Sequence, residues 1–154
     1  MQTKKVYDET AEDFTKTVYI DSSPDIIYNL LTTTDNISIW WQNEVSGSTE
    51  HNGKVHFSFE NPEEYIIANV EIAEFNAEVL WRVTEDTRTA TGEWIGTGIL
   101  FLLKRDGTKT QLRLRHIGLT PALGSYRTKS ENWNRLVENI VREAESRGEQ
   151  DRGM

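Results

Sequence analysis

Residues 133–148 read WNRLVENIVREAESRG, and their apolar residues are spaced as on one face of a helix. They recur at i, i+3, i+4, i+7, i+8 and i+11: Trp133, Leu136, Val137, Ile140, Val141 and Ala144. Such a stripe predicts a long amphipathic helix that buries one face. Residues 128–131, TKSE, have the form of a capping box, although the helix could begin a few residues earlier, and Gly148 is a natural stop.

The chain before this helix predicts strands joined by short turns. Alternating stretches rich in β-branched and aromatic residues are typical of strands. They occur at residues 14–20, 54–59, 65–74, 79–83, 94–104 and 110–117. Tight turns are expected at residues 52–53, 76–77 and 106–107, and short turns between successive strands indicate antiparallel pairing.

Two short helices are expected after the first strand. Pro24 suits the first position of a helix and Ser23 suits its N-cap, so the first of them covers Pro24 to about Thr32. The second covers residues 35–41 and is capped by Thr34 or Asp35. Residues 85–93 are polar and are predicted to form a turn.

We therefore expect an α+β fold in which a curved antiparallel sheet of about six or seven strands wraps around the C-terminal helix. That helix is the only predicted element long and apolar enough to cover the sheet. Gly96 and Gly98, inside the strand at 94–104, would help the sheet bend. Residues 1–154 are expected to form a single domain, with its core at about 14–147 and flexible polar tails at 1–12 and 148–154.

The composition argues against several classes of partner. The chain has 17 Lys and Arg against 25 Asp and Glu, a net charge of −8, which disfavours nucleic acid and anionic membrane surfaces. The absence of Cys excludes disulfides and zinc fingers and favours a reducing compartment. No apolar run approaches the ~20 residues of a membrane span, and the N-terminus does not resemble a signal peptide. We expect a soluble cytoplasmic protein.

Large side chains on the predicted concave face of the sheet are the candidate ligand contacts, although filling the core is their default role. In the pair Trp40-Trp41, one ring could fill the core while the other covers a loop, or the pair could form a ligand-facing wall. The strand at 94–104 is apolar on both faces, so Leu100 and Leu102 could replace Ile99 and Phe101 as the inward residues. The candidate ligand-binding residues are Trp40, Trp41, Phe57, Phe59, Trp81, Trp94, Phe101, Leu114, His116, Trp133 and Val137.

His116 continues the inward phase of the last strand. A buried His could orient a ligand, act as a general base, or be a core polar group with satisfied hydrogen bonds. No His cluster has metal-ligand spacing, and the common nucleophile, phosphate-binding and zinc-protease motifs are missing. The sequence thus assigns no catalytic residue, metal or cofactor. Arg82 is expected to pair with a carboxylate on a neighbouring strand, such as Glu71 or Glu78.

Several segments together resemble the START-like, or SRPBCC, superfamily. Residues 18–28, VYIDSSPDIIY, look like the opening strand and helix of the family. Residues 39–41, IWW, look like the l-x-x-W-W segment of the branch named for the activator of the heat-shock-protein-ninety ATPase. Residues 114–119, LRHIGL, resemble the last strand of that branch, and Trp133 resembles the Trp that leads its final helix. The resemblance covers about residues 14–147. The branch often has Trp where Tyr28 stands and Gly where Asn132 stands.

This resemblance implies a helix-grip fold with a hydrophobic cavity between the sheet and the long helix. Our first hypothesis is therefore the binding of a small apolar or amphipathic molecule in that cavity. The second is a protein-interaction module associated with a chaperone. The third is an enzyme, such as a cyclase or hydrolase, that uses His116 or a buried carboxylate in the cavity. An edge strand could also pair across a two-fold axis to form a homodimer.

Overall fold

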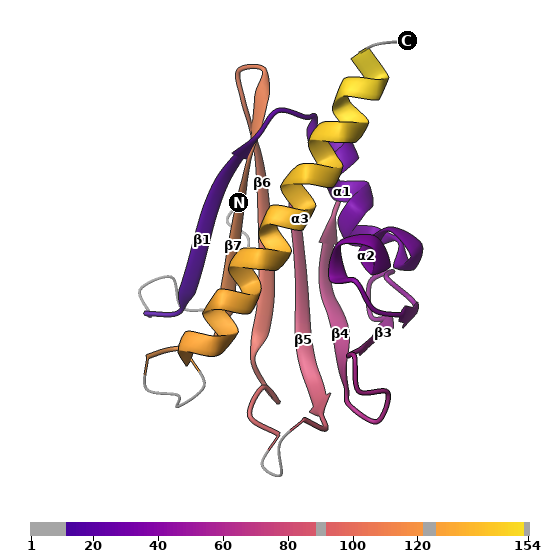
Figure 1. The fold of residues 1–154 in the computed structure, drawn as a ribbon, viewed down its shortest axis with the longest axis vertical. Coiled ribbons are helices and arrows are strands. Elements are labelled where there is room, and N and C mark those ends of the chain that lie inside the picture. The colour runs from indigo at the N-terminus through magenta and orange to yellow at the C-terminus, as the bar shows by residue number, and fades with distance from the viewer. Residues whose placement is uncertain (1–11, 89–91, 122–125, 153–154) are drawn as a thin grey trace, which may run out of the picture.

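The computed structural model describes residues 12–88, 92–121 and 126–152. Its elements, in chain order, are β1 (Phe14–Ile20), α1 (Pro24–Thr32), α2 (Thr34–Trp41), β2 (Val45–Gly47), β3 (Lys54–Ser58), β4 (Tyr65–Glu74), β5 (Glu78–Asp86), β6 (Gly98–Asp106), β7 (Lys109–Ile117) and α3 (Tyr126–Arg152). The sheet has the strand order β1-β7-β6-β5-β4-β3-β2, and every neighbouring pair is antiparallel. Helix α3 lies diagonally across one face of this sheet (Figure 1). The predicted α+β fold is confirmed.

Alternation along the strands decides which face is covered. In β4, the side chains of Ile66, Ala68 and Val70 are buried, while the residues between them are partly exposed. In β6, the core contains Ile99 and Phe101, so this is the inward phase of the two that the sequence left open. The apolar stripe of α3 covers this face, because Trp133, Val137 and Ile140 belong to the same core. None of the described helices combines the length and apolar character that a membrane crossing needs.

Helix α3 differs from its predicted extent at both ends. It is already helical at Tyr126, before the TKSE segment, and it continues through Gly148 to Arg152. The prediction that Gly148 ends the helix is wrong, because α3 continues to Arg152; this glycine instead lies close to the connection between β1 and α1. A Cβ at Gly148 would lie 3.0 Å from Ser22 Oγ and 3.2 Å from the carbonyl oxygen of Asp21. The missing side chain lets α3 pack against the connection between β1 and α1.

Other elements also differ from the prediction. Strand β2 was not expected, since three residues are too few to show alternation. Helix α2 begins one residue earlier and its N-cap is Thr33. Strand β5 extends to Asp86, into the stretch predicted to be a turn. The next strand begins at Gly98 rather than Trp94, because residues 94–97 form turns that hydrogen-bond to Val83.

The irregularity of the sheet also lies elsewhere than expected. The register between β4 and β5 shifts between Ile67 and Ala68 and again between Val70 and Ile72. The glycines proposed to bend the sheet stand outside the interior of β6: Gly96 precedes it, with φ +88°, and Gly98 is its first residue. The irregular register, where a β-bulge would be found, therefore belongs to the β4–β5 pair.

Candidate functional site

A cluster of aromatic rings fills the space between the middle of the sheet and α3. The ring centroids of Trp81 lie 5.1 Å from those of both Phe57 and Phe101, and 6.4 Å from that of Trp40. All four side chains are fully buried. Parallel and tilted contacts at these distances are the usual packing of aromatic residues. At this level of the sheet, the predicted concave-face residues therefore pack against one another.

A pocket opens at one end of this cluster, where β3 and β5 end and α3 begins. Its walls come from four parts of the chain: the end of α2 with the segment after it, the residue after β3, the loop between β5 and β6, and the first turns of α3. The lining residues are Trp41, Asn43, Phe59, Arg88, Trp94, Lys129, Asn132, Trp133, Arg135 and Leu136. Its volume is about 90 Å³, the liquid volume of about three water molecules. Pockets that enclose drug-sized ligands measure roughly 300–1,000 Å³.

The adjacent residues Trp40 and Trp41 have different surroundings. The indole nitrogen Nε1 of Trp40 donates to the carbonyl oxygen of Leu30 at 2.8 Å, and its ring stacks on Trp81 in the core. The Nε1 of Trp41 donates to the carbonyl oxygen of Ser58 at 2.7 Å, and its ring lines the pocket. Trp40 therefore fills the core, and a ligand-facing role for Trp41 stays a prediction.

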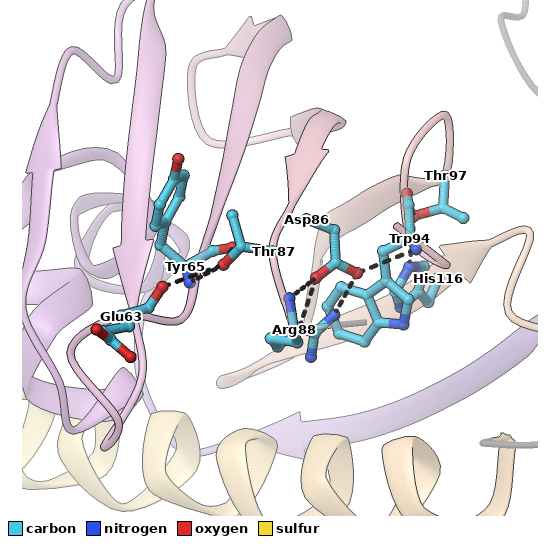
Figure 2. Close-up of polar contacts among 8 residues, drawn as sticks. All are labelled: Glu63, Tyr65, Asp86, Thr87, Arg88, Trp94, Thr97 and His116. Carbon is cyan, nitrogen blue, oxygen red and sulfur yellow. Dashed lines mark hydrogen bonds and ion pairs between the residues drawn. The ribbon is translucent and has the colours of Figure 1, made fainter. Parts of the chain in front are cut away.

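Arg88 lies on the wall of the pocket and forms an ion pair with Asp86, which stands outside the lining (Figure 2). The Nε and Nη2 atoms of Arg88 donate to the two carboxylate oxygens of Asp86, each at 2.9 Å. The backbone N–H of Trp94 donates to the same carboxylate at 3.1 Å. Burial acts to raise the pKa of Asp86, but the hydrogen bonds and charge of Arg88 outweigh it, so this pKa lies below its ordinary value. Both carboxylate oxygens are thus occupied.

The guanidinium of Arg88 also lies over two aromatic rings. Its central carbon is 4.1 Å from the ring centroid of Trp94 and 4.8 Å from that of Phe59. These are cation–π distances. The preceding residue, Thr87, anchors this segment, because its hydroxyl accepts a hydrogen bond from the backbone N–H of Tyr65 at 2.8 Å (Figure 2). The end of β5 is thereby tied to the start of β4, and Arg88 is held against the aromatic wall.

His116 lies behind the pocket, fully buried. Its Nδ1 accepts a hydrogen bond from Trp133 Nε1 at 2.9 Å, and its Nε2 lies 2.9 Å from Thr97 Oγ1. The Thr97 hydroxyl donates to the carbonyl oxygen of Trp94 at 2.6 Å, so the His116 Nε2 must carry the hydrogen that it shares with Thr97. Burial, and then the charge of Arg88, lower the pKa of His116 to about 3. The imidazole is neutral at pH 7 and both nitrogens are bonded within the core.

The structure divides the eleven candidate ligand-binding residues among three places. Four of them line the pocket: Trp41, Phe59, Trp94 and Trp133. Six lie in the core outside the pocket lining: Trp40, Phe57, Trp81, Phe101, Leu114 and His116. Val137 lines an open groove of about 610 Å³ between β1 and α3, together with Val18, Tyr19 and Val141. Their contact with a ligand stays a prediction.

Sequence reasoning missed the polar members of the pocket: Asn43, Arg88, Lys129, Asn132 and Arg135. Three of them, Lys129, Asn132 and Arg135, share the first turns of α3 with Trp133, and that common position was the available signal. Outside the pocket, the expected partner of Arg82 is confirmed, because its Nη2 lies 3.2 Å from Glu71 Oε1.

Comparison with known proteins gives likeness of structure. No family model matches the sequence, and no curated protein matches it. Among solved structures, the Aha1 dimer from Colwellia psychrerythraea matches with a TM-score of 0.74 and 23% identity, over 86% of this chain and 96% of that chain. Protein MLL2253 from Mesorhizobium loti matches with a TM-score of 0.70 and 17% identity, over 84% and 95%. PFC0360w, an HSP90 activator from Plasmodium falciparum, matches with a TM-score of 0.64 and 14% identity, over 84% and 94%.

The TM-scores establish a likeness of fold, and at these low identities the conclusion goes no further than the fold. The chain has the fold of the Aha1-like structures, with the strands, the two short helices and the long C-terminal helix in the same arrangement. The matching structures include an Aha1 dimer and an HSP90 activator, so the likeness of fold that the sequence predicted is confirmed.

Proposed function

We propose that this protein binds a small amphipathic molecule in the pocket between the end of the sheet and the first turns of α3. The observation that carries the proposal is the composition of the wall. Four aromatic side chains stand there beside two amides and three cations. A mainly apolar recess with a few convergent polar groups is the usual form of a small-molecule site.

The volume of the pocket limits what it encloses. About 90 Å³ accommodates one ring or one end of a longer molecule. The aromatic core behind the pocket is filled by Trp81, Phe57 and Phe101, so a ligand that stays clear of these rings extends outward from the pocket. The proposal is therefore a ligand with an apolar end inside the pocket and a polar part at its mouth.

Native mass spectrometry of the protein, purified gently from its source cells, tests this proposal. We expect a folded mass that exceeds the denatured mass by that of a small molecule. Asn132 is exposed and lines the pocket, so Asn132→Trp should fill the pocket and remove the extra mass. Asn134→Trp introduces the same side chain on the same helix, outside the pocket lining, and should retain it.

Equal folded and denatured masses for the unmodified chain would count against a tightly held ligand. Extra mass that survives in Asn132→Trp would place the ligand elsewhere, with the groove between β1 and α3 as the next site to block. Unfolding midpoints of both variants, compared with that of the unmodified chain, show whether either substitution acts through the fold.

A chaperone contact is a second candidate function, supported by the likeness to the HSP90 activator from Plasmodium falciparum. Two large apolar side chains are available for such a contact: Phe75 is 73% exposed and Ile39 is 48% exposed. Purified HSP90 should then bind the unmodified chain in a saturable manner, and Phe75→Ser should weaken the binding. If HSP90 shows no saturable binding, this candidate is rejected.

Self-association is supported by the likeness to the Colwellia Aha1 structure, which is a dimer. In this chain β1 is an edge strand of seven residues, since within the described sheet it pairs only with β7. An edge of this kind can pair with a second copy across a two-fold axis. Sedimentation equilibrium would show a concentration-dependent dimer if this is so, and a single monomer mass over the full concentration range if it is not.

A further inference from the structure

The charged side chains that line the pocket have one sign, although the chain as a whole is acidic. The net charge is −8, yet the ten lining residues include three cations and no Asp or Glu. The cations are Arg88, Lys129 and Arg135. A concave wall of one charge sign concentrates ions of the other sign near it.

The three cations differ in how their charge is compensated. Arg88 is neutralised by Asp86, and the two side chains are 9% and 1% exposed. The charge of Arg88, on the pocket wall, is therefore already compensated. Among the residues that the structure describes, Lys129 and Arg135 make no ion pair with a carboxylate; Arg135 donates from Nη1 to the neutral amide oxygen of Gln42 at 3.1 Å.

Lys129 is placed where an anion would improve its surroundings. Its Nζ lies 5.8 Å from the ring centroid of Trp94, on the pocket wall. Burial lowers the pKa of Lys129 and the charge of Arg88 lowers it further, while Asp86, Glu93 and Glu64 act in the opposite direction. A partly desolvated ammonium beside another cation is stabilised by a negative group that enters the pocket.

We infer that the ligand of this pocket is an organic anion, with its apolar part against Trp41, Trp94 and Trp133 and its carboxylate, or a similar anionic group, between Lys129 and Arg135. This inference rests on the proposed function and specifies the class of ligand. The aromatic walls and the paired Arg88 give no preference for charge, so selectivity for an anion comes from the two cations that α3 contributes.

Three probes of nearly equal shape separate the effect of charge from the effect of the apolar body: 2-naphthoate, 2-naphthamide and 2-(aminomethyl)naphthalene. Isothermal titration calorimetry at low salt measures each of them. We expect 2-naphthoate to bind about tenfold more tightly than 2-naphthamide, because charge-assisted hydrogen bonds contribute more than neutral ones. The cationic probe should bind more weakly than the amide.

Lys129→Gln and Arg135→Gln should each weaken 2-naphthoate binding by about three- to tenfold and leave 2-naphthamide binding unchanged. Lys109→Gln is the matched control. It removes the same charge from an exposed Lys at the β6–β7 hairpin, which lies at the opposite end of the sheet from the start of α3 (Figure 1). It should leave the affinity of both probes unchanged.

The outcomes distinguish this inference from the proposed function. If 2-naphthoate and 2-naphthamide bind equally, and Asn132→Trp abolishes both, the pocket binds small molecules but the inference of an anion is wrong. If Lys109→Gln weakens 2-naphthoate as much as Lys129→Gln does, a general charge effect replaces the specific one. If none of the three probes binds although native mass spectrometry shows a ligand that Asn132→Trp removes, the inference is wrong and the proposed function stands; if that ligand is missing as well, both are wrong.

Discussion

Tryptophan occurs both inside the aromatic cluster and at the pocket beside it, in different surroundings. We call these regions the core end and the pocket end. At the core end, Trp40 and Trp81 stack on each other, and both contact Phe101 edge to face. At the pocket end, Trp41 and Trp94 stand beside Arg88, Lys129 and Arg135. The core end holds the sheet to the helices, and the pocket end carries the features of a binding site.

The difference shows that the richness of this chain in Trp does not by itself indicate a ligand site. A buried ring surrounded by rings contributes packing. A ring that also borders solvent and charged side chains can contact a ligand. The adjacent pair Trp40 and Trp41 separates the two cases within one turn of helix, so substitutions at the two ends should have different consequences.

The largest expected effect is on the core end. Trp81→Ala should lower the free energy of unfolding by about 3–5 kcal/mol, because it leaves a cavity amid Trp40, Phe57 and Phe101. Its Nε1 has no hydrogen-bond partner among the described residues, so the loss measures packing. Urea unfolding measures it, with Phe75→Ala at an exposed position as the control. A loss under 1 kcal/mol would mean that the core end is not packed as described.

Arg88→Met tests the wall of the pocket. The substitution removes the charge and leaves the carboxylate of Asp86 buried without its partner. We expect a loss of about 3 kcal/mol in the free energy of unfolding, which is the usual size when a buried ion pair is broken. Adding Asp86→Asn should recover part of the loss, since no unpaired charge then remains. A double variant that is less stable than Arg88→Met would contradict this reading.

The pH dependence of stability tests His116. Burial holds its pKa at about 3 in the folded chain, whereas the unfolded chain takes up a proton below about pH 6.5. Its contribution to stability is therefore complete above pH 6.5 and is lost, by about 1.4 kcal/mol per pH unit, as the pH falls toward 3.

Asn at position 116 does not titrate, and its Oδ1 can take the place of His116 Nδ1 as the acceptor from Trp133, so His116→Asn should flatten this part of the curve although it loses the contact with Thr97. The carboxylates titrate in both proteins and cancel in the difference. Unfolding free energies that fall in parallel between pH 7 and pH 5 would show that His116 is not neutral and buried as described.

The smallest effects separate Trp40 from Trp41. Each Nε1 donates to a backbone carbonyl, so Trp40→Phe and Trp41→Phe should lower the free energy of unfolding by similar amounts, about 1–3 kcal/mol. Only Trp41→Phe should also weaken the binding of 2-naphthoate, by about threefold. If Trp40→Phe weakens binding as much, the ligand reaches the core end and the comparison between the two ends is wrong.

Local patterns explain what could be predicted from the sequence. The alternation in β4, the helical spacing from Trp133 to Ala144, and Pro24 at the start of α1 depend on residues close in sequence, and the structure confirms them. Gly148 was misread as a stop because its reason is a contact with Ser22, which lies far away in the sequence. The phase of β6 stayed open because both of its faces are apolar.

The site was less predictable for the same physical reason. Aromatic residues of the pocket could be nominated because large apolar side chains are rarely left exposed. Arg88 belongs to a loop that meets α3 only after folding, and nothing in its local sequence marks it, whereas the signal for Lys129 was its position near Trp133 at the start of α3. The satisfied hydrogen bonds of His116 likewise depend on Thr97 and Trp133, which three separate segments bring together.

The indole N–H signals of the five Trp residues test the distinction between the two ends most directly. They can be recorded in a ¹H–¹⁵N correlation spectrum and assigned by single Trp→Phe substitutions. During titration with 2-naphthoate, the signals of Trp41, Trp94 and Trp133 should shift, and those of Trp40 and Trp81 should shift much less. Equal or larger shifts at Trp40 and Trp81, or no shift at any indole, would contradict a binding site at the pocket end.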